Sequence, residues 1–347
     1  MAVQAELIAD MVIVSQNHFG KNRWTDLSYD LQEHVAWNQL LRKHKIQFEE
    51  GLQHEFQIIT EDNGMAEHVE LYQELTIGAP DTMTKGTIPI RHTNTKWMYD
   101  DREIAANAGQ AMINSIVKVR RHSAMVSLIK KVETNFWGKP ASSADQVTPW
   151  GIRTSIVHDD ANTTPALAGG NPTGFSGGYA GVDSATVTRW RNWDTVYTDL
   201  TQSDGIKKIR EMIVKSQFMA PVASPSYQQG PPKRTINLNY DSLQALEDAA
   251  RNQNDSLGFD VAATDGQTTF RRIPITYVPY LDADATDPII GIDWSYLFPV
   301  FRAGFWMKEH PPEKSENNPN VKKCFIDLSW NLKNVDRRRH WIAQKAA

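Results

Sequence analysis

The sequence predicts an α+β protein whose domains are discontinuous along the chain. Three observations predict it: strand signals before residue 100, one long helical pattern directly after it, and strand signals that return from residue 270 to the end. With 347 residues, 40% hydrophobic and 22% charged, the chain is long enough for two or three domain-sized units.

Composition and charge exclude several classes of protein. The single cysteine, Cys324, excludes an intramolecular disulfide framework and fits folding in a reducing cytoplasm. No run of about 18 apolar residues predicts a membrane span, and the short apolar run at residues 7–14 lacks the basic region of an export signal. The formal net charge of −4 gives no overall attraction to nucleic acid, so such contact requires local basic patches.

The first hundred residues read as an arm followed by a long β excursion. Residues 1–53 form the arm, and the spacing of Leu31, Val35, Leu40 and Leu41 predicts one helix in it. Residues 54–99 carry strand signals on both sides of Asn63-Gly64, a pair that favours a tight hairpin turn. A Lys85-Gly86 turn is expected before a further strand. Because the excursion has too little apolar content for a core, it is expected to lie along its own domain or to reach another chain.

Residues 100–138 give the clearest helix. Asp100 with Glu103 predicts a capping box, and Gly138 followed by Pro140 predicts the end. The apolar positions repeat every three or four residues over roughly 55 Å, at about 1.5 Å per residue. Gly109 favours a bend or a close contact.

Residues 140–187 are rich in glycine and small polar residues, and they predict an ordered or partly mobile surface loop without a ligand. No GxxxxGK spacing identifies a phosphate loop. The aromatic group that follows, Trp190, Trp193 and Tyr197, could stack on a ligand, but core or interface packing is favoured because no basic residues continue past Arg191.

Residues 188–265 alternate between helical and strand-like patterns and predict a compact α/β lobe. One helix is expected after Asp204-Gly205 and a second after Asn239 or Asp241, with a strand at residues 235–238 between them. Strands from residue 270 onward return the chain to the domain of the long helix, so the lobe is expected to be an insertion.

No constellation of an enzyme is visible, and we predict no catalytic, cofactor-binding or metal site. The histidines form no HExxH and no short metal spacing. Asp282, Asp284 and Asp287 alternate like calcium ligands, but Asp287 stands where a calcium loop needs glycine, so a solvated turn is favoured. Asp159-Asp160 has no visible acid/base partner, and no GxSxG nucleophile elbow occurs.

Four late segments carry a resemblance to a known family: IPITYVPYL at 273–281, IIGIDWSYLF at 289–298, WMKEHPP at 306–312 and NVDRRRH at 334–340. With the order of the predicted elements, they resemble the major capsid proteins of tailed phages of the Hong Kong 97 type. The resemblance implies an N-terminal arm at 1–53, an extended hairpin (E-loop) at 54–99, a peripheral domain at 100–187 and 266–347 with a spine helix at 100–138, and an axial domain at 188–265.

The resemblance implies a coat protein, not an enzyme, that self-assembles through hexamers and pentamers into an icosahedral shell around double-stranded DNA. Expected contacts between subunits are the apolar hairpin residues and one lysine: Phe56, Ile58, Val69, Leu71, Leu75, Ile77, Lys85 and Ile88. Expected charged contacts, to neighbouring subunits or packaged DNA, are Arg120, Arg121, Arg337, Arg338 and Arg339, although a solvated charge run explains the last three equally well.

The implied partners are further copies of the chain, a separate scaffolding protein, a portal, a decoration protein and, non-specifically, DNA, with no membrane and no cofactor. The implied location is the virion, after assembly in the host cytoplasm. Two alternatives stay open: a virion-attached or secreted carbohydrate-binding protein that uses the tryptophan-rich middle, and a hydrolase with a scattered acid/base pair.

Overall fold

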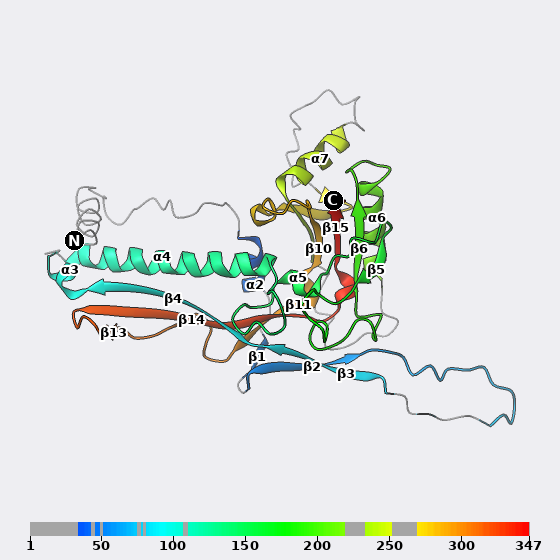
Figure 1. Cartoon of the computed structure of the whole chain (residues 1–347), viewed down its shortest axis with the longest axis horizontal. Helices are drawn as coiled ribbons and strands as arrows, with labels where there is room; N and C mark the ends of the chain where they lie inside the picture. Colours follow the sequence, from blue (N-terminus) through cyan, green and yellow to red (C-terminus); the bar gives the residue numbers. More distant parts are fainter. Residues whose placement is uncertain are drawn as a thin grey trace. The chain divides into compact units, whose positions relative to one another are not determined.

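The structure is a computed structural model, and it describes residues 34–42, 46–48, 51–74, 78, 81–106, 110–218, 233–251 and 269–346 (Figure 1). Its described part divides into two compact units. The first unit contains residues 93–132 and 307–328, and the second contains residues 35–92, 133–306 and 329–347. Most of the predicted arm therefore lies outside the described residues.

The first unit combines a long helix with a sheet. The predicted helix at 100–138 is present as α3 (Asp101–Ala106) and α4 (Gln110–Trp137), with Gly109 outside the described residues. Ala124, Leu128 and Val132 recur every four residues along α4 and are buried, as a single apolar stripe requires. The sheet pairs β14 (Val321–Asn334) with β4 (Arg91–Asp100), β12 (Lys308–Glu309) and β13 (Glu313–Lys314).

The predicted capping box is only half formed. Asp100 accepts a hydrogen bond from the backbone N–H of Arg102 at 2.8 Å, as an N-cap residue should. Glu103 does not complete the box, because its carboxylate binds the guanidinium of Arg120 at 2.6 and 2.8 Å. The ion pair of Glu103 with Arg120 on α4 therefore replaces the hydrogen bond that Glu103 would accept from the Asp100 N–H in a complete capping box.

A seven-stranded mixed sheet, here called the lobe sheet, dominates the second unit. Its order is β5 (Ala166–Gly169), β6 (Asn192–Tyr197), β15 (Trp341–Lys345), β10 (Ile289–Asp293), β7 (Arg234–Leu238), β9 (Ile273–Tyr277) and β8 (Thr269–Phe270). Helices α6 (Gly205–Ser216) and α7 (Tyr240–Arg251) contribute Ile209, Met212 and Leu246 to one apolar cluster on it.

The lobe sheet extends beyond the boundary expected at residue 265. Strands β9, β10 and β15 all come from later in the chain, and β15 lies between β6 and β10. The physical reason is visible at Gly291, where an added Cβ would lie 2.0 Å from the Trp341 ring, so β10 and β15 fit closely only with glycine there. The helices expected after Asp204-Gly205 and near Asp241 are present.

The second unit also contains strands and short helices outside the lobe sheet. Strand β11 (Leu297–Arg302) pairs antiparallel with residues 330–334 of β14 and parallel with β1 (Ile46–Phe48). The predicted arm helix is α2 (Val35–Arg42). Short helical turns are α5 (Ile152–Ser155), η2 (Pro279–Leu281), η3 (Trp294–Tyr296) and η4 (Arg337–Arg339).

The hairpin has a different turn from the predicted one. Strand β2 (Gln53–Ile59) pairs antiparallel with β3 (Met83–Pro89), from Gln53 opposite Pro89 to Ile59 opposite Met83 (Figure 1). Asn63-Gly64 therefore lies within the long connection instead of forming the hairpin turn. Lys85-Gly86 is inside β3, so the turn expected there was also wrong.

The glycine-rich run is part of a core. The expected loop has almost no regular structure and many of its residues are exposed, but Phe175, Tyr179 and Val182 are buried in a cluster with Phe56 and Ile88 of the hairpin. The Tyr179 hydroxyl donates a hydrogen bond to the Leu332 carbonyl at 3.3 Å, which satisfies it away from water. Aromatic burial thus orders a segment that has almost no regular structure.

Candidate functional site

An exposed segment with apolar side chains follows β2. We call residues 60–82 the hairpin extension; its described residues are 60–74, 78, 81 and 82, and none lies in a strand or helix. Val69, Leu71 and Tyr72 are 51%, 90% and 100% exposed. Six carboxylates and no lysine or arginine occur in the extension: Glu61, Asp62, Glu67, Glu70, Glu74 and Asp81. An exposed apolar segment of this kind is typical of a surface that binds another protein.

The root of the hairpin, in contrast, packs within its own chain. Phe56 and Ile88 are 7% and 0% exposed and belong to the cluster of the glycine-rich run, and Ile58 packs against that cluster. The Thr87 N–H donates to the Ala180 carbonyl at 2.8 Å. Phe56 and Ile88 are therefore buried within their own chain, which corrects their expected contact with another subunit, whereas the partly buried Ile58 stays a candidate contact.

Asn331 fastens the hairpin to β14. Its buried side-chain oxygen accepts N–H bonds from Trp150 at 2.9 Å and Leu332 at 2.8 Å, and its amide donates to the Pro89 carbonyl at 2.5 Å. Sequence reasoning missed this role, because the partners lie up to 242 residues away. Asn331 lies between Trp330 and Leu332 in β14, and this position gave no signal of its partners.

A buried lysine lies beneath the hairpin. The Lys333 amine lies 4.4 Å from the centre of the Phe56 ring and 3.4 Å from His54 Nε2, and the residue is 3% exposed. Burial lowers the pKa of Lys333 from 10.5 to about 8. Burial and then the Lys333 charge also lower the pKa of His54. Burial of the Lys333 ammonium at the base of the hairpin therefore has an electrostatic cost for folding.

A buried glutamate holds the arm helix. Glu133, fully buried on α4, accepts the N–H groups of Ala36 at 3.1 Å and Trp37 at 2.9 Å, in the first turn of α2. It also accepts the Trp137 indole N–H at 2.7 Å. The carboxylate supplies acceptors to helix N–H groups that would otherwise have none, and its charge suits the positive end of the helix.

Arg337 is an internal group, which corrects its expected role in contact with DNA or another subunit. The residue is 0% exposed, and its guanidinium donates to the carbonyls of Ser155, Trp190, Gly169 and Gly170 and to the side chain of Asn192 at 2.7 to 3.3 Å. Burial lowers the pKa of Arg337 to about 9.

The other two tail arginines are also engaged within the chain. Arg338 pairs with Asp336 at 2.9 Å, while the buried Arg339 donates to the Phe218 carbonyl, and both guanidinium groups lie over the Phe218 ring. The solvated charge run is therefore also wrong for Arg337 and Arg339.

The arginines of α4 form ion pairs inside the first unit. Arg120 binds Glu103, as described above, and Arg121 binds Glu309 at 2.5 Å. In the described part of the chain, Lys118 and Lys131 of α4 are exposed and no ion pair involves them. Lys85 pairs with Glu55 at 2.5 Å across the hairpin.

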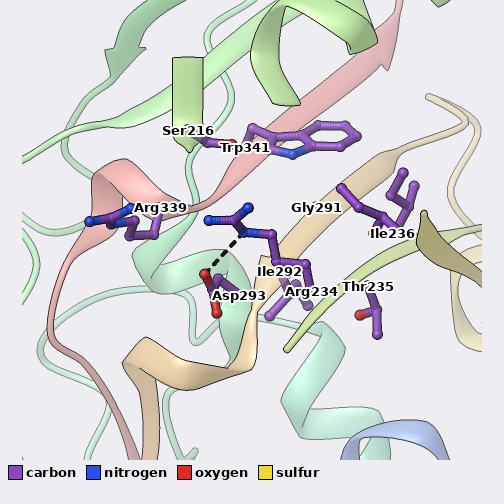
Figure 2. A pocket seen from close by; sticks show the side chains of 10 residues that line it. Ser216, Arg234, Thr235, Ile236, Gly291, Ile292, Asp293, Arg339 and Trp341 are labelled. Carbon is purple, nitrogen blue, oxygen red and sulfur yellow. Dashed lines mark hydrogen bonds and ion pairs between the residues drawn. The ribbon is translucent and has the colours of Figure 1, made fainter. Parts of the chain in front are cut away.

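Two cavities lie in the described part of the second unit. Figure 2 shows one lined by Arg234, Asp293, Arg339 and Trp341; its volume of about 10 Å³ suits one water, and Arg234 pairs with Asp293 at 3.2 Å. An open groove of about 480 Å³ surrounds His158, whose Nδ1 is 2.5 Å from the buried Asp194.

Two further observations bear on ligands and membranes. Within the described ranges, no group of three or more His, Cys, Asp or Glu side chains could hold a metal ion. Among these residues no helix is both long and apolar enough to cross a membrane. Asp284, one of the three alternating aspartates, instead pairs with Arg153 at 2.6 Å.

The tryptophan-rich middle provides no stacking platform. Trp190 is buried and donates its indole N–H to the Tyr179 carbonyl at 3.2 Å, and Tyr197 is buried in the cluster of the lobe sheet. Trp193 is partly buried, with the Lys215 amine 5.3 Å from its ring centre. The carbohydrate-binding alternative therefore loses the feature on which it depended.

Comparison with known proteins identifies the fold. No protein-family model and no curated protein matches the chain. A chain of the capsid asymmetric unit of cyanophage A-1(L) matches with a TM-score of 0.65 at 13% identity, over 96% of this chain and 99% of that one. A capsid chain of a native GTA particle matches at 0.58 and 12% identity, over 97% and 99%. The capsid of Myoviridae phage XM1 gives 0.52 and 8%, over 95% and 97%. The chain thus has the α+β fold of these capsid chains over nearly its whole length.

Proposed function

We propose that this chain is the major capsid protein of a tailed phage, which assembles through hexamers and pentamers into an icosahedral shell around double-stranded DNA. The observation that carries the proposal is the match to capsid chains over nearly the full length of both partners. A shell subunit needs surfaces that fit further copies rather than reactive groups.

The order of the elements supports the finer assignment. We assign the β2–β3 hairpin with its extension as the E-loop, α4 as the spine helix of the peripheral domain, and the lobe sheet with α6 and α7 as the axial domain. The arm precedes the hairpin, as α2 and β1 indicate. The axial domain then includes β9, β10 and β15, because these strands complete its sheet.

The contact with a neighbouring copy is best supported at the hairpin extension. Val69 and Leu71 remain as contact residues because they are exposed, whereas Phe56 and Ile88 are buried in the chain's own core. Leu75 and Ile77 lie outside the described residues. Covering exposed apolar side chains removes them from water, at roughly 25 cal/mol per Å².

The remaining partners follow from the same function. We propose a separate scaffolding protein, a portal and a decoration protein as partners, with assembly in the host cytoplasm and the virion as final location. For non-specific contact with packaged DNA we propose the exposed lysines of α4, Lys118 and Lys131, in place of the paired Arg120 and Arg121.

The test introduces charge into the hairpin extension. Val69→Asp with Leu71→Asp should give a folded, soluble protein that forms no shells, tubes or capsomer rings, because two carboxylates would have to be buried in the contact. Negative-stain electron microscopy and sedimentation report assembly, and circular dichroism reports folding.

Val147→Asp is the matched control, because Val147 is 76% exposed and lies outside the hairpin, so this variant should assemble normally. Normal shells from the double variant would contradict the hairpin contact. A wild-type protein that stays monomeric even with its scaffolding protein would contradict the capsid function itself.

A further inference from the structure

The turn between β8 and β9 holds two arginines in a costly backbone conformation. Phe270 lies opposite Ile273, so Arg271 and Arg272 form a two-residue turn. Their φ angles are 52° and 65°, in the left-handed region. Asn and Gly are the residues that such turns prefer, because a larger side chain crowds the backbone there. The fold alone would favour other residues at both positions.

These arginines are not used by the described part of their own chain. Arg271 and Arg272 are exposed, and none of the ion pairs between described residues includes them. The exposed Arg210 of α6 adds a third guanidinium, whose carbon lies 5.8 Å from the centre of the Phe270 ring. We call Arg210, Arg271 and Arg272 the arginine turn.

Helix α7 presents the opposite charge. Leu243 and Leu246 point into the cluster of the lobe sheet, while Asp241, Glu247 and Asp248 are exposed. These three carboxylates, here called the acidic face, form no ion pair with any side chain that the structure describes, and Arg251 at the end of α7 is the one basic residue of the helix. One lobe thus carries two patches of opposite sign that form no ion pair among the described side chains.

We infer that the arginine turn of one copy binds the acidic face of α7 on a second copy. The inference rests on the proposed function, because rings of six or five copies need a contact between two different surfaces that repeats head to tail. Guanidinium groups suit carboxylates because they donate two parallel hydrogen bonds. Charge complementarity within the lobe selects the second copy over nucleic acid, since phosphate would satisfy the arginines and leave the acidic face unpaired.

The test uses two charge reversals in the full chain. Arg271→Glu with Arg272→Glu puts acid against acid at every contact, and Asp241→Lys with Glu247→Lys and Asp248→Lys puts base against base. Each variant alone should need an about tenfold higher protein concentration for half-maximal assembly, as expected for a loss of about 1.4 kcal/mol. Each should keep a wild-type circular dichroism spectrum.

Mixing supplies the decisive result. A one-to-one mixture should recover assembly, because the new glutamates then meet the new lysines and the native arginines meet the native acids. Alternation of two variants closes only in even-numbered rings, so hexamers should return and pentamers should not. A mixture that remains unassembled overturns the inference.

A further variant separates this role from a structural one. Arg271→Asn with Arg272→Gly gives the turn its preferred residues, so the monomer should melt a few degrees higher while assembly weakens. Wild-type assembly by this variant or by Arg271→Glu with Arg272→Glu overturns the inference. If such a variant assembles normally but binds a DNA oligonucleotide more weakly, the inference is also overturned.

A cross-linking test is independent of shell formation. A mixture of the single variants Arg272→Cys and Asp248→Cys should give a disulfide-linked dimer on oxidation, because the inferred contact brings these two positions together. Cys324, the one native cysteine, is buried and should not react. A mixture of Lys314→Cys with Asp248→Cys is the control. Absence of a dimer above this control overturns the inference even where the capsid function holds; failure of wild-type assembly with a positive cross-link overturns only the function.

Discussion

Lys333 is a residue whose charge works against the fold. Its pKa is about 8 in the folded chain against 10.5 for an ordinary lysine, so folding disfavours the ammonium. A pKa lowered to about 8 corresponds to a cost of about 3 kcal/mol for the charged form. Below pH 8 both folded and unfolded chains are protonated, and the full cost is present. Between pH 8 and 10.5 the unfolded chain binds more protons, so stability rises with pH.

We therefore expect Lys333→Met to raise the free energy of unfolding by about 2 to 3 kcal/mol at pH 7, because the thioether packs on Phe56 without a charge. Urea unfolding at pH 7, 8, 9 and 10 measures it, and the gain over the wild type should shrink as the pH rises. Lys131→Met, at an exposed position, should change little. A loss of stability in Lys333→Met would show that the cation contact with Phe56 outweighs burial.

The burial of the tail arginines could not be predicted from the sequence. Three adjacent arginines look like a solvated surface run, yet the acceptors that bury Arg337 come from residues 155, 169, 170, 190 and 192. Those acceptors are mostly backbone carbonyls, which every residue has. Side-chain type alone therefore carried no sign of the partners of Arg337.

Among the elements, the hairpin depends on a close approach at Gly86. A Cβ there would lie 2.7 Å from Cζ of the Phe56 ring and 3.1 Å from Ile58 Cδ1. Gly86→Ala should therefore push Phe56 out of its cluster and lower the free energy of unfolding by about 1 to 3 kcal/mol. Chemical denaturation measures it, and limited proteolysis of the hairpin should become faster.

Gly177→Ala is the control, because no atom lies within 4 Å of a Cβ at that glycine. It should be neutral or slightly stabilising, since alanine reduces the freedom of the unfolded chain. Equal stability of the two alanine variants would mean that the Phe56 ring can shift without cost.

Helices were more predictable than strand partners. The four-residue spacing of Ala124, Leu128 and Val132 is local, so it identified α4 from the sequence. The pairing of Ile59 with Met83 joins residues across a long connection, and the Asn63-Gly64 signal favoured a shorter one. The inward role of Phe175 and Tyr179 was hidden because glycine-rich composition describes backbone freedom rather than burial.

At the scale of the whole molecule, the order of elements predicted the fold better than any single motif did. The capsid-like fold is confirmed by matches over at least 95% of the chain. The candidate contacts were less predictable: Val69 and Leu71 are exposed and stay candidates, whereas Phe56 and Ile88 are buried in the core. Which apolar residues stay outside depends on the rest of the packed chain.

The proposed contact of α4 with packaged DNA can be tested at Lys118 and Lys131. Lys118→Glu with Lys131→Glu should lower the slope of log affinity against log salt by roughly 2 for binding of a DNA duplex, one for each lost phosphate contact. A salt titration of fluorescence anisotropy measures it. Lys207→Glu with Lys314→Glu, two exposed lysines outside α4, is the charge-matched control. Equal slopes for the two variants would assign DNA contact to another surface.

The Glu133 contact determines when the arm helix α2 can dock during synthesis of the chain. The carboxylate lies 97 residues after the Ala36 N–H that it accepts, so a ribosome making about 5 to 20 residues per second needs roughly 5 to 20 s more to add it. An eight-residue helix is only marginally stable by itself in water. The N-terminal end of α2 therefore has no acceptor from Glu133 until α4 has left the ribosome. The arm is therefore synthesised early but can dock only late, after the helix that holds it.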